Sequence, residues 1–187
     1  DGTDLKVIDN LSFDAEDGEF LSILGPSGCG KSTVLNIVAG LARPNAGNVE
    51  MDGNRLAFGG EKLPSAIGYV FQDARLLNWM TVEDNLELIL EAAGVPQGEW
   101  DSRISHYLAM VGLSAVRGRF PLELSGGMAQ RVSFVRALMI NPRVILMDEP
   151  LGSLDAITAR KLRYDLLRLW EETRPTVLYV THNISEA

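Results

Sequence analysis

A glycine-rich run between residues 25 and 32 has the residue types and spacing to bind phosphate. It reads G-P-S-G-C-G-K-S and fits the pattern G-x-x-x-x-G-K-[ST]. Glycines let backbone N–H groups turn inward around a phosphate, and a helix that follows adds its positive end. A lysine can reach the β- and γ-phosphates, and the final serine hydroxyl can ligate Mg²⁺. The run therefore predicts a nucleotide site centred on Lys31 and Ser32.

Two adjacent carboxylates, Asp148 and Glu149, follow the apolar run 144–147. A strand tip beside a phosphate loop suits an aspartate that organises magnesium, and the next glutamate is then placed to act as general base toward water. An acidic turn at the end of a strand is the ordinary alternative. The phosphate loop in the same chain favours the functional interpretation.

Residues 124–128, which read L-S-G-G-M, have a third pattern with chemical meaning. Ser125 is a helix N-cap candidate, and a helix N-terminus is a second anion-binding geometry. Two glycines at the start of a helix cost stability. We therefore expect the backbone there to approach another group closely.

These groups need strands and helices to hold them. Hydrophobic spacing predicts strands beginning in 7–13 and covering 19–24, 143–148 and 176–181, and helices over 32–41, 81–94, 100–111, 125–140 and 156–172. Thr81 and Asp84 form a capping-box pattern at one helix start. Strands that alternate with helices predict an α/β fold with a mostly parallel sheet covered on both faces. Phe13 is expected to belong to the core.

Length and composition limit the remaining possibilities. The chain has 187 residues, 46% of them hydrophobic, which predicts one domain, 1–187. We divide it into a core, 1–81 and 141–187, and a helical insertion, 82–140. The net charge of −8 argues against a nucleic-acid surface. A single cysteine excludes an internal disulfide, and no apolar run approaches the roughly 18 residues of a membrane span.

The order of the motifs resembles that of the ABC (ATP-binding cassette) ATPases. L-S-G-G-M is similar to the family's signature L-S-G-G-Q, with Met128 in place of glutamine. Gln72 resembles the glutamine of the Q-loop, 152–155 resembles the D-loop, and His182 resembles the switch histidine. The resemblance covers residues 25 to 182 and implies a P-loop NTPase core, an N-terminal antiparallel β portion and an inserted helical subdomain.

The resemblance also implies how the site works. Two cassettes would dimerise head to tail around two ATP molecules with Mg²⁺, each nucleotide lying between one phosphate loop and the other subunit's signature. The implied catalytic residues are Glu149, His182, Gln72 and Lys31. The implied nucleotide-binding residues are Gly25, Pro26, Ser27, Gly28, Cys29, Gly30, Lys31, Ser32, Thr33, Ser125, Gly126, Gly127 and Asp155. The implied magnesium ligands are Ser32, Gln72 and Asp148.

The chain departs from the family pattern at both ends. Family members stack an aromatic residue on adenine at a position that falls at or before the first few residues here, and 1–6 contain none. The family also continues past the equivalent of residue 187. We therefore expect a cassette that is shortened at both ends and has reduced turnover in isolation.

Residues 71–85, F-Q-D-A-R-L-L-N-W-M-T-V-E-D-N, are similar to the nitrate/sulfonate/taurine importer group. This implies a second ATPase subunit (a homodimer), integral-membrane permease subunits, indirect contact with a solute-binding protein, and a peripheral place on the cytoplasmic face of the bacterial inner membrane. Trp79 and the pair Leu76 and Leu77 are candidate permease contacts, with buried packing as the alternative.

Other functions remain to be weighed against import. Cassettes for lipoprotein release or cell division carry the same ATPase motifs. Chromosome-maintenance relatives insert long coiled coils where this chain has a compact helical segment, and the acidic charge disfavours them further. A binding module without catalysis is disfavoured because Lys31, Glu149 and His182 are all present.

Overall fold

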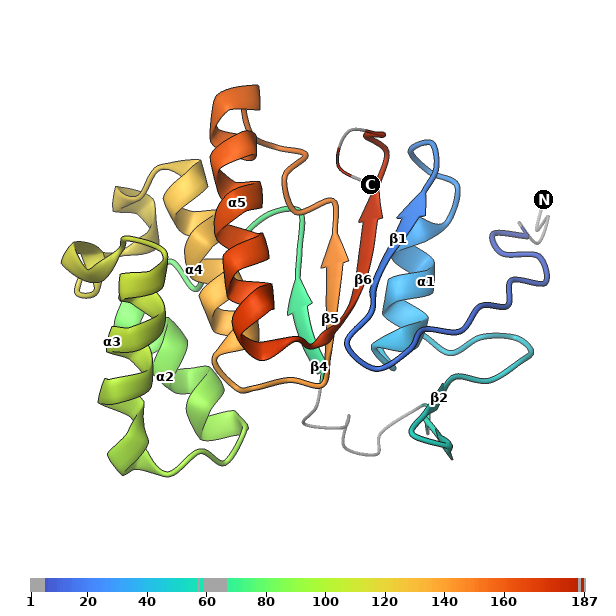
Figure 1. The fold of residues 1–187 in the computed structure, drawn as a ribbon, viewed down its shortest axis with the longest axis horizontal. Helices are drawn as coiled ribbons and strands as arrows, with labels where there is room; N and C mark the ends of the chain where they lie inside the picture. The colour runs from blue at the N-terminus through green and yellow to red at the C-terminus, as the bar shows by residue number, and fades with distance from the viewer. Residues whose placement is uncertain (1–5, 57, 59–66, 185, 187) are drawn as a thin grey trace.

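A parallel sheet brings distant parts of the chain together at the centre of the molecule (Figure 1). The computed structural model describes residues 6–56, 58, 67–184 and 186. The strands stand in the order β1 (Phe20–Leu24), β6 (Thr176–Thr181), β5 (Val144–Asp148) and β4 (Ile67–Val70). Each neighbouring pair is parallel, with Leu24 opposite Thr181 and Asp148 opposite Val180. The carboxyl ends of the strands therefore meet at one edge.

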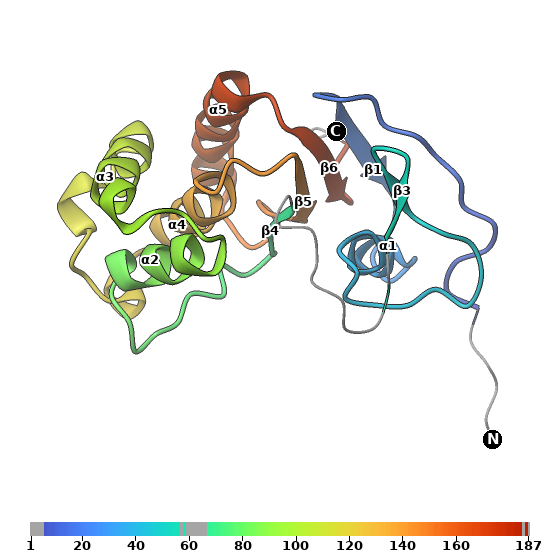
Figure 2. The ribbon, with the colours of Figure 1, turned by 90° about the horizontal axis from the view of Figure 1, so that it is seen from below.

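Helices cover both faces of this sheet (Figure 2). α1 (Lys31–Val38) covers one face, where Leu35 packs with Leu146 and Val180. α4 (Gly126–Leu138) and α5 (Ala156–Thr173) cover the other, where Phe134 and Leu162 join the larger apolar cluster. Burial on both faces explains why β5 and β6 are continuously apolar rather than alternating. The predicted α/β fold with a mostly parallel sheet is confirmed.

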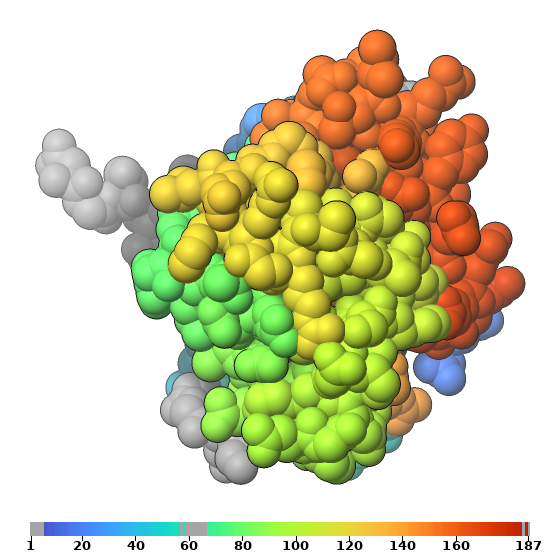
Figure 3. All heavy atoms as spheres, turned by 90° about the vertical axis from the view of Figure 1, so that its left-hand side faces the viewer, coloured from blue at the N-terminus to red at the C-terminus, as the bar shows by residue number. Residues whose placement is uncertain are grey.

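The remaining helices lie at the end of the molecule far from β1, and they form most of the face shown in Figure 3. They are α2 (Val82–Ala92) and α3 (Trp100–Met110), with 3₁₀ turns at Gln97–Glu99, Ser114–Val116 and Pro121–Glu123. The predicted capping box forms, because Thr81 accepts a hydrogen bond from the Asp84 backbone and the Asp84 carboxylate accepts one from the Thr81 backbone. The larger apolar cluster runs without interruption from these helices to the sheet.

An antiparallel hairpin, β2 (Glu50–Met51) and β3 (Asn54–Arg55), stands apart from the main sheet. Its turn residues Asp52 and Gly53 have φ of 54° and 74°. Two left-handed residues suit the right-handed twist of a tight hairpin, and Asp-Gly is a sequence signal for such a turn. The expected antiparallel portion is therefore present, at a place that hydrophobic spacing did not reveal.

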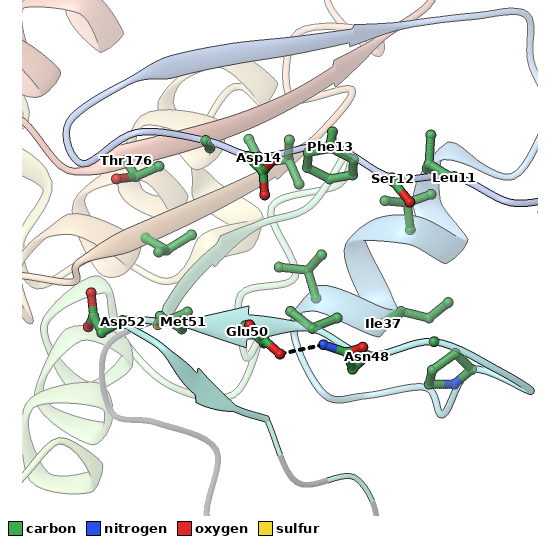
Figure 4. Close-up of a pocket in the computed structure, with 18 of the residues that line it drawn as sticks. Leu11, Ser12, Phe13, Asp14, Ile37, Asn48, Glu50, Met51, Asp52 and Thr176 are labelled. Atoms are coloured by element: carbon green, nitrogen blue, oxygen red, sulfur yellow. Dashed lines mark hydrogen bonds between the residues drawn. The ribbon is translucent and has the colours of Figure 1, made fainter.

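The prediction of a strand beginning in 7–13 is wrong. These residues form a loop, and Asn10 interrupts any extended run with a φ of 49°. Phe13 is not in the core: it is 41% exposed. It lines an open hollow of about 650 Å³ between this loop, α1 and the residues around Glu50 (Figure 4). None of the predicted site residues lines this hollow.

Two further differences have local steric causes. The first helix ends at Val38 rather than near residue 41, because Gly40 takes a φ of 72° and the N–H of Leu41 turns back to the carbonyl of Asn36. β4 was not predicted, since only four residues form it. A Cβ at Gly68 would lie 2.6 Å from the carbonyl oxygen of Ala137, so glycine allows α4 to pack directly on β4.

Candidate active site

The carboxyl ends of the parallel strands surround one cavity. The glycine-rich loop follows β1, Gln72 follows β4, Asp148 and Glu149 lie at the end of β5, and His182 follows β6. This edge is where open α/β sheets bind their ligands. The cavity measures about 370 Å³ and is lined by Val7, Ser27, Gly28, Gly30, Lys31, Ser32, Thr33, Gln72, Asp148 and Glu149. It is smaller than the hollow beside Phe13, but of the predicted catalytic residues Lys31, Gln72 and Glu149 line it, and only His182 does not.

The glycine-rich loop needs its glycines for two reasons. Gly28 and Gly30 have φ of 81° and 99°, conformations that a side chain disfavours. A Cβ at Gly30 would also lie 3.0 Å from Cγ1 of Val7. Val7 belongs to the loop 7–13, for which the sequence predicts a strand. No sequence pattern identifies it as a site residue. The loop leads directly into α1, whose N-terminus points positive charge at the cavity.

Lys31 is nearly buried, with 6% of its surface exposed. Its Nζ donates hydrogen bonds to the carbonyl oxygens of Gly25 and Pro26, at 2.9 and 2.8 Å. Nζ also lies 3.4 Å from Oε1 of Glu149. A buried ammonium group is tolerated only with such partners. Because all of these partners are oxygen acceptors, phosphate oxygens could replace them.

Glu149 joins two predicted site residues through one carboxylate. Oε1 faces Lys31, and Oε2 lies 2.8 Å from Nδ1 of His182. The Glu149 backbone is left-handed, with a φ of 44°, and its N–H donates to the carbonyl of Val180 at 2.9 Å. Such a conformation costs on the order of 1–3 kcal/mol and persists only where its surroundings enforce it. β6 therefore both carries His182 and holds Glu149 beside it.

Ser32 and Asp148 form the part of the cavity suited to magnesium. The Ser32 hydroxyl donates to Oδ1 of Asp148 at 2.9 Å. Hydroxyl and carboxylate oxygens are ligands that Mg²⁺ prefers, and it usually completes its shell with waters and phosphates. Across the described ranges no cluster of three or more His, Cys, Asp or Glu could hold an ion alone. The pair, with Gln72 in the same cavity, thus fits a magnesium ion shared with a bound phosphate.

The loop that carries Gln72 is held by side chains from α4. Gln130 donates to the carbonyl of Phe71 at 3.0 Å, and the Arg136 guanidinium donates to the carbonyls of Ala74 and Arg75 at 2.9 and 2.8 Å. Burial lowers the pKa of Arg136. No pattern in the sequence distinguishes Gln130 and Arg136, because the same helix also carries the polar residues Arg131 and Ser133.

The structure does not bring Ser125, Gly126 or Gly127 to this cavity. Ser125 caps α4 by accepting the Met128 N–H at 3.3 Å. The close approach expected at the glycines is made by this chain's own α5, since a Cβ at Gly127 would lie 2.6 Å from Cγ2 of Thr158. Internal packing therefore accounts for Gly127, and the segment that includes Gly126 stands apart from the Lys31 site.

Asp155 also lies outside the set of cavity residues. Its Oδ1 accepts the backbone N–H groups of Ile157 and Thr158, each at 3.1 Å, so it is the N-cap of α5. Hydrogen bonds from Thr158 are the main cause that lowers the pKa of Asp155. The expected adenine-stacking position falls largely on residues 1–5, which lie outside the described part of the chain.

Comparison with known proteins agrees with this geometry. The family model described as "ABC transporter" matches residues 8–152. The chain is 43% identical, over its whole length, to a taurine import ATP-binding protein of Roseobacter denitrificans, of which it covers 68%. It is 44% identical, over 97% of its length, to a nitrate import ATP-binding protein of Synechococcus elongatus, of which it covers 65%. An aliphatic sulfonates import ATP-binding protein of Bacillus cereus is 40% identical over 98% of the chain. The chain thus spans about two thirds of the length of these relatives.

Among solved structures, a dimeric ATP-binding cassette in a post-hydrolysis state, bound to ADP and Pi, superposes with a TM-score of 0.85. It is 37% identical and matches 97% of this chain and 82% of its own. Its nucleotide-bound state is consistent with ATP hydrolysis in this fold and with a cavity built from a phosphate loop and an acidic pair, of which Glu149 contacts His182. By its sequence, its fold and the arrangement of these groups, the chain belongs to the ABC transporter family, as an ATPase cassette.

Proposed function

We propose that this chain hydrolyses ATP to drive the import of a small solute of the nitrate, sulfonate or taurine kind through a membrane permease. The observation that carries the proposal is the contact of Glu149 with both Lys31 and His182, beside the Ser32–Asp148 pair. The names of the import ATP-binding relatives support the transport role and the solute class.

Each side chain has a role that its present contacts allow. Lys31 exchanges its loop carbonyls for β- and γ-phosphate oxygens, while the loop N–H groups and the α1 N-terminus bind the same anion. Glu149 accepts a proton from the attacking water, and His182 contacts the γ-phosphate side of the cavity. Water thus adds to the γ-phosphorus as the bond to ADP breaks. Ser32, Asp148 and Gln72 would hold Mg²⁺, which neutralises phosphate charge when bound.

A second copy would complete the nucleotide site. The signature residues 125–127 and Asp155 do not line the cavity of their own chain, and the solved cassette that superposes here is dimeric. We propose that each signature segment contacts the nucleotide of the partner copy, so that ATP holds the dimer together. Residues 82–140 would then act as the helical subdomain that presents the signature, and 1–81 with 141–187 as the nucleotide-binding core.

Trp79 is the strongest candidate for the permease contact. It is 76% exposed, whereas Leu76 packs against the apolar core. Backbone hydrogen bonds join residues 82 and 83 to residues 119 and 117, so the segment that holds exposed Phe120 and Leu122 begins beside the start of α2. Among the described residues no helix is long and apolar enough to cross a membrane. We propose a peripheral place on the cytoplasmic face of the inner membrane, reached through this surface.

The nucleotide part is tested by ATP binding and turnover in Lys31→Ala. We expect loss of binding to a fluorescent ATP analogue, because the ammonium group is the main cation in the cavity. Lys161→Ala, an exposed lysine on α5, is the matched control and should bind normally. Equal binding by the two variants would contradict the proposed site.

The transport part is tested with a candidate permease from the same genome. Vesicles holding the permease, this ATPase subunit and the solute-binding protein should take up labelled taurine, nitrate or an alkanesulfonate only with ATP. Trp79→Ala should weaken co-purification with the permease, while Tyr164→Ala, 64% exposed on α5, should not. ATP turnover without any permease association would favour a non-import system instead.

A further inference from the structure

One carboxylate collects three hydrogen bonds from the residues around His182. Oε2 of Glu186 accepts from the hydroxyl of Tyr179 at 3.0 Å and from Oγ1 of Thr181 at 2.8 Å. Oε1 accepts from Nδ2 of Asn183 at 3.1 Å. Thr181 and Asn183 are the residues on either side of His182, so this carboxylate binds both neighbours of the histidine.

Backbone bonds close the same turn. The N–H of Asn183 donates to Oγ1 of Thr181 at 3.0 Å, and the N–H of Glu186 donates to the carbonyl of Asn183, also at 3.0 Å. The Thr181 hydroxyl therefore has two hydrogen bonds: it accepts one from the backbone N–H of Asn183 and donates one to the Glu186 carboxylate. His182 therefore lies between Thr181 and Asn183, each of which makes more than one hydrogen bond within this turn.

The donors on β6 are buried, which makes Glu186 costly to replace. Tyr179 is 2% exposed and Thr181 is 1% exposed. A buried hydroxyl without a hydrogen-bond partner destabilises the folded state. Burial, with Glu186 as the next cause, raises the pKa of Tyr179, so its phenol stays protonated and remains a donor.

The His182 ring has little else to orient it. Its side chain is 47% exposed, and its hydrogen bond in the described part of the chain is the one from Nδ1 to Glu149. With half of the ring in solvent, the position of the imidazole depends on this bond and on the backbone from which the side chain projects. That backbone is the turn that Glu186 closes.

We propose that Glu186 is a positioning residue that aims His182 at Glu149. The proposal rests on the proposed function, in which His182 acts beside the γ-phosphate. Glu186 contributes no atom to the cavity lining. It acts through Thr181 and Asn183, which fix the place of the imidazole relative to the general base. The competing interpretation is that Glu186 only satisfies the buried hydroxyls and stabilises the fold.

The chain offers an internal control for the test, because it has only two histidines. His106 also pairs with a carboxylate, Nε2 lying 3.0 Å from Oε1 of Glu172, on the exposed surface. Histidine ring signals in NMR spectra can thus be assigned with one substitution of each histidine. Glu172→Ala is the matched control for Glu186→Ala.

When Glu186 is intact, Glu149→Gln should shift the ring signal of His182 and leave that of His106 in place. In Glu186→Ala, the His182 signal should move and no longer respond to Glu149→Gln. Glu186→Gln keeps an acceptor oxygen for the two hydroxyls and should restore the response. Glu172→Ala should move only the His106 signal. An unchanged His182 signal in Glu186→Ala, or equal losses in the Gln and Ala variants, would overturn the proposal.

Kinetics separate positioning from stability. In the assembled transporter, Glu186→Ala should lower kcat for ATP by on the order of tenfold to a hundredfold, while KM for ATP stays within about twofold. A fall in the melting temperature together with lost ATP binding would instead favour a purely structural role and overturn the inference. His182→Ala tests the underlying function independently: full turnover in that variant would refute the role of His182, whatever the NMR result for Glu186.

Discussion

Nζ of Lys31 lies 3.4 Å from Oε1 of Glu149, so the proposed phosphate-binding cation and the proposed general base are in contact. Oε2 of the same carboxylate contacts His182 at 2.8 Å. The two contacts hold the glutamate on the cavity side of the sheet edge. Nucleotide binding must redistribute these partners, since the phosphate oxygens compete with Glu149 for the ammonium group.

Replacing Glu149 with glutamine should separate binding from turnover. The substitution removes the proton acceptor and should lower ATP turnover by about a hundredfold or more. It also removes a negative charge beside the phosphate site, so the affinity for ATP should be unchanged or higher. Turnover and equilibrium binding of labelled ATP check the two parts. Undiminished turnover would contradict the assignment of Glu149 as general base.

Alkylation of Cys29 should block nucleotide binding. Cys29 is the only cysteine of the chain, and it is exposed within the phosphate loop. A maleimide adduct on this loop would crowd the space beside Gly28 and Gly30, where the phosphates are proposed to bind. We expect N-ethylmaleimide to abolish ATP binding, prior MgATP to protect the thiol, and Cys29→Ser to be insensitive. Normal ATP binding by the fully alkylated protein, with labelling checked by mass spectrometry, is the contrary outcome.

Gly127→Ala should destabilise the contact between α4 and α5. The new methyl group would lie 2.6 Å from Cγ2 of Thr158, a distance that forces either the Thr158 side chain or one of the two helices to shift. Overpacking of this kind costs about 1–3 kcal/mol of unfolding free energy. Thr158→Ala in the same chain removes the clashing methyl and should recover most of the loss, as measured by urea unfolding.

Gly126→Ala is the matched control for that experiment. Its nearest neighbour would be Cδ2 of Leu154 at 3.6 Å, an ordinary contact. We expect a change within about 0.5 kcal/mol for this variant. If both alanines lowered stability equally, the packing explanation for Gly127 would be wrong and its glycine would need another cause.

The capping box of α2 should make a pH-dependent contribution to stability. Hydrogen bonds from Thr81, first from its side chain and then from its backbone, lower the pKa of Asp84 below 3.8. A carboxyl group whose pKa is lower in the folded state than in the unfolded state stabilises the folded state at a pH above its unfolded-state pKa. This contribution is lost as the pH falls through its folded-state pKa. The difference in unfolding free energy between the wild type and Asp84→Asn should thus be largest near neutral pH and shrink below pH 3.8.

Thr81→Ala removes the hydroxyl that accepts the Asp84 N–H and should lower the unfolding free energy by about 1 kcal/mol. Thermal unfolding over a pH series, with Glu91→Gln on an exposed part of the same helix as control, measures both effects. A gap between wild type and Asp84→Asn that stays constant down to pH 2 would show that the Asp84 charge does not contribute.

Hydrophobic spacing located the long elements well because each buries a continuous apolar face. The strand at 176–181 was predicted with the bounds that the structure has, and the helices at α3 and α5 agree within one residue. Hydrophobic spacing does not predict the short elements, because β4 has only four residues and each strand of the hairpin has two. The prediction of a strand in 7–13 fails because its apolar residues do not cover a sheet face: Ile8, Leu11 and Phe13 line an open hollow, and Val7 lines the cavity beside Lys31.

The sequence by itself determined which side chains are candidates for the site, since Lys31, Ser32, Asp148, Glu149 and His182 occur in motifs that follow one another in the order typical of the family. Only the tertiary structure decided how these groups meet. Parallel pairing aligns the ends of β1, β4, β5 and β6, which places the lysine, the carboxylates and the histidine within a few ångströms. It also showed that Gly127 serves α5 packing and that Glu186 closes the turn of His182. These contacts join residues through space, and no linear pattern records them.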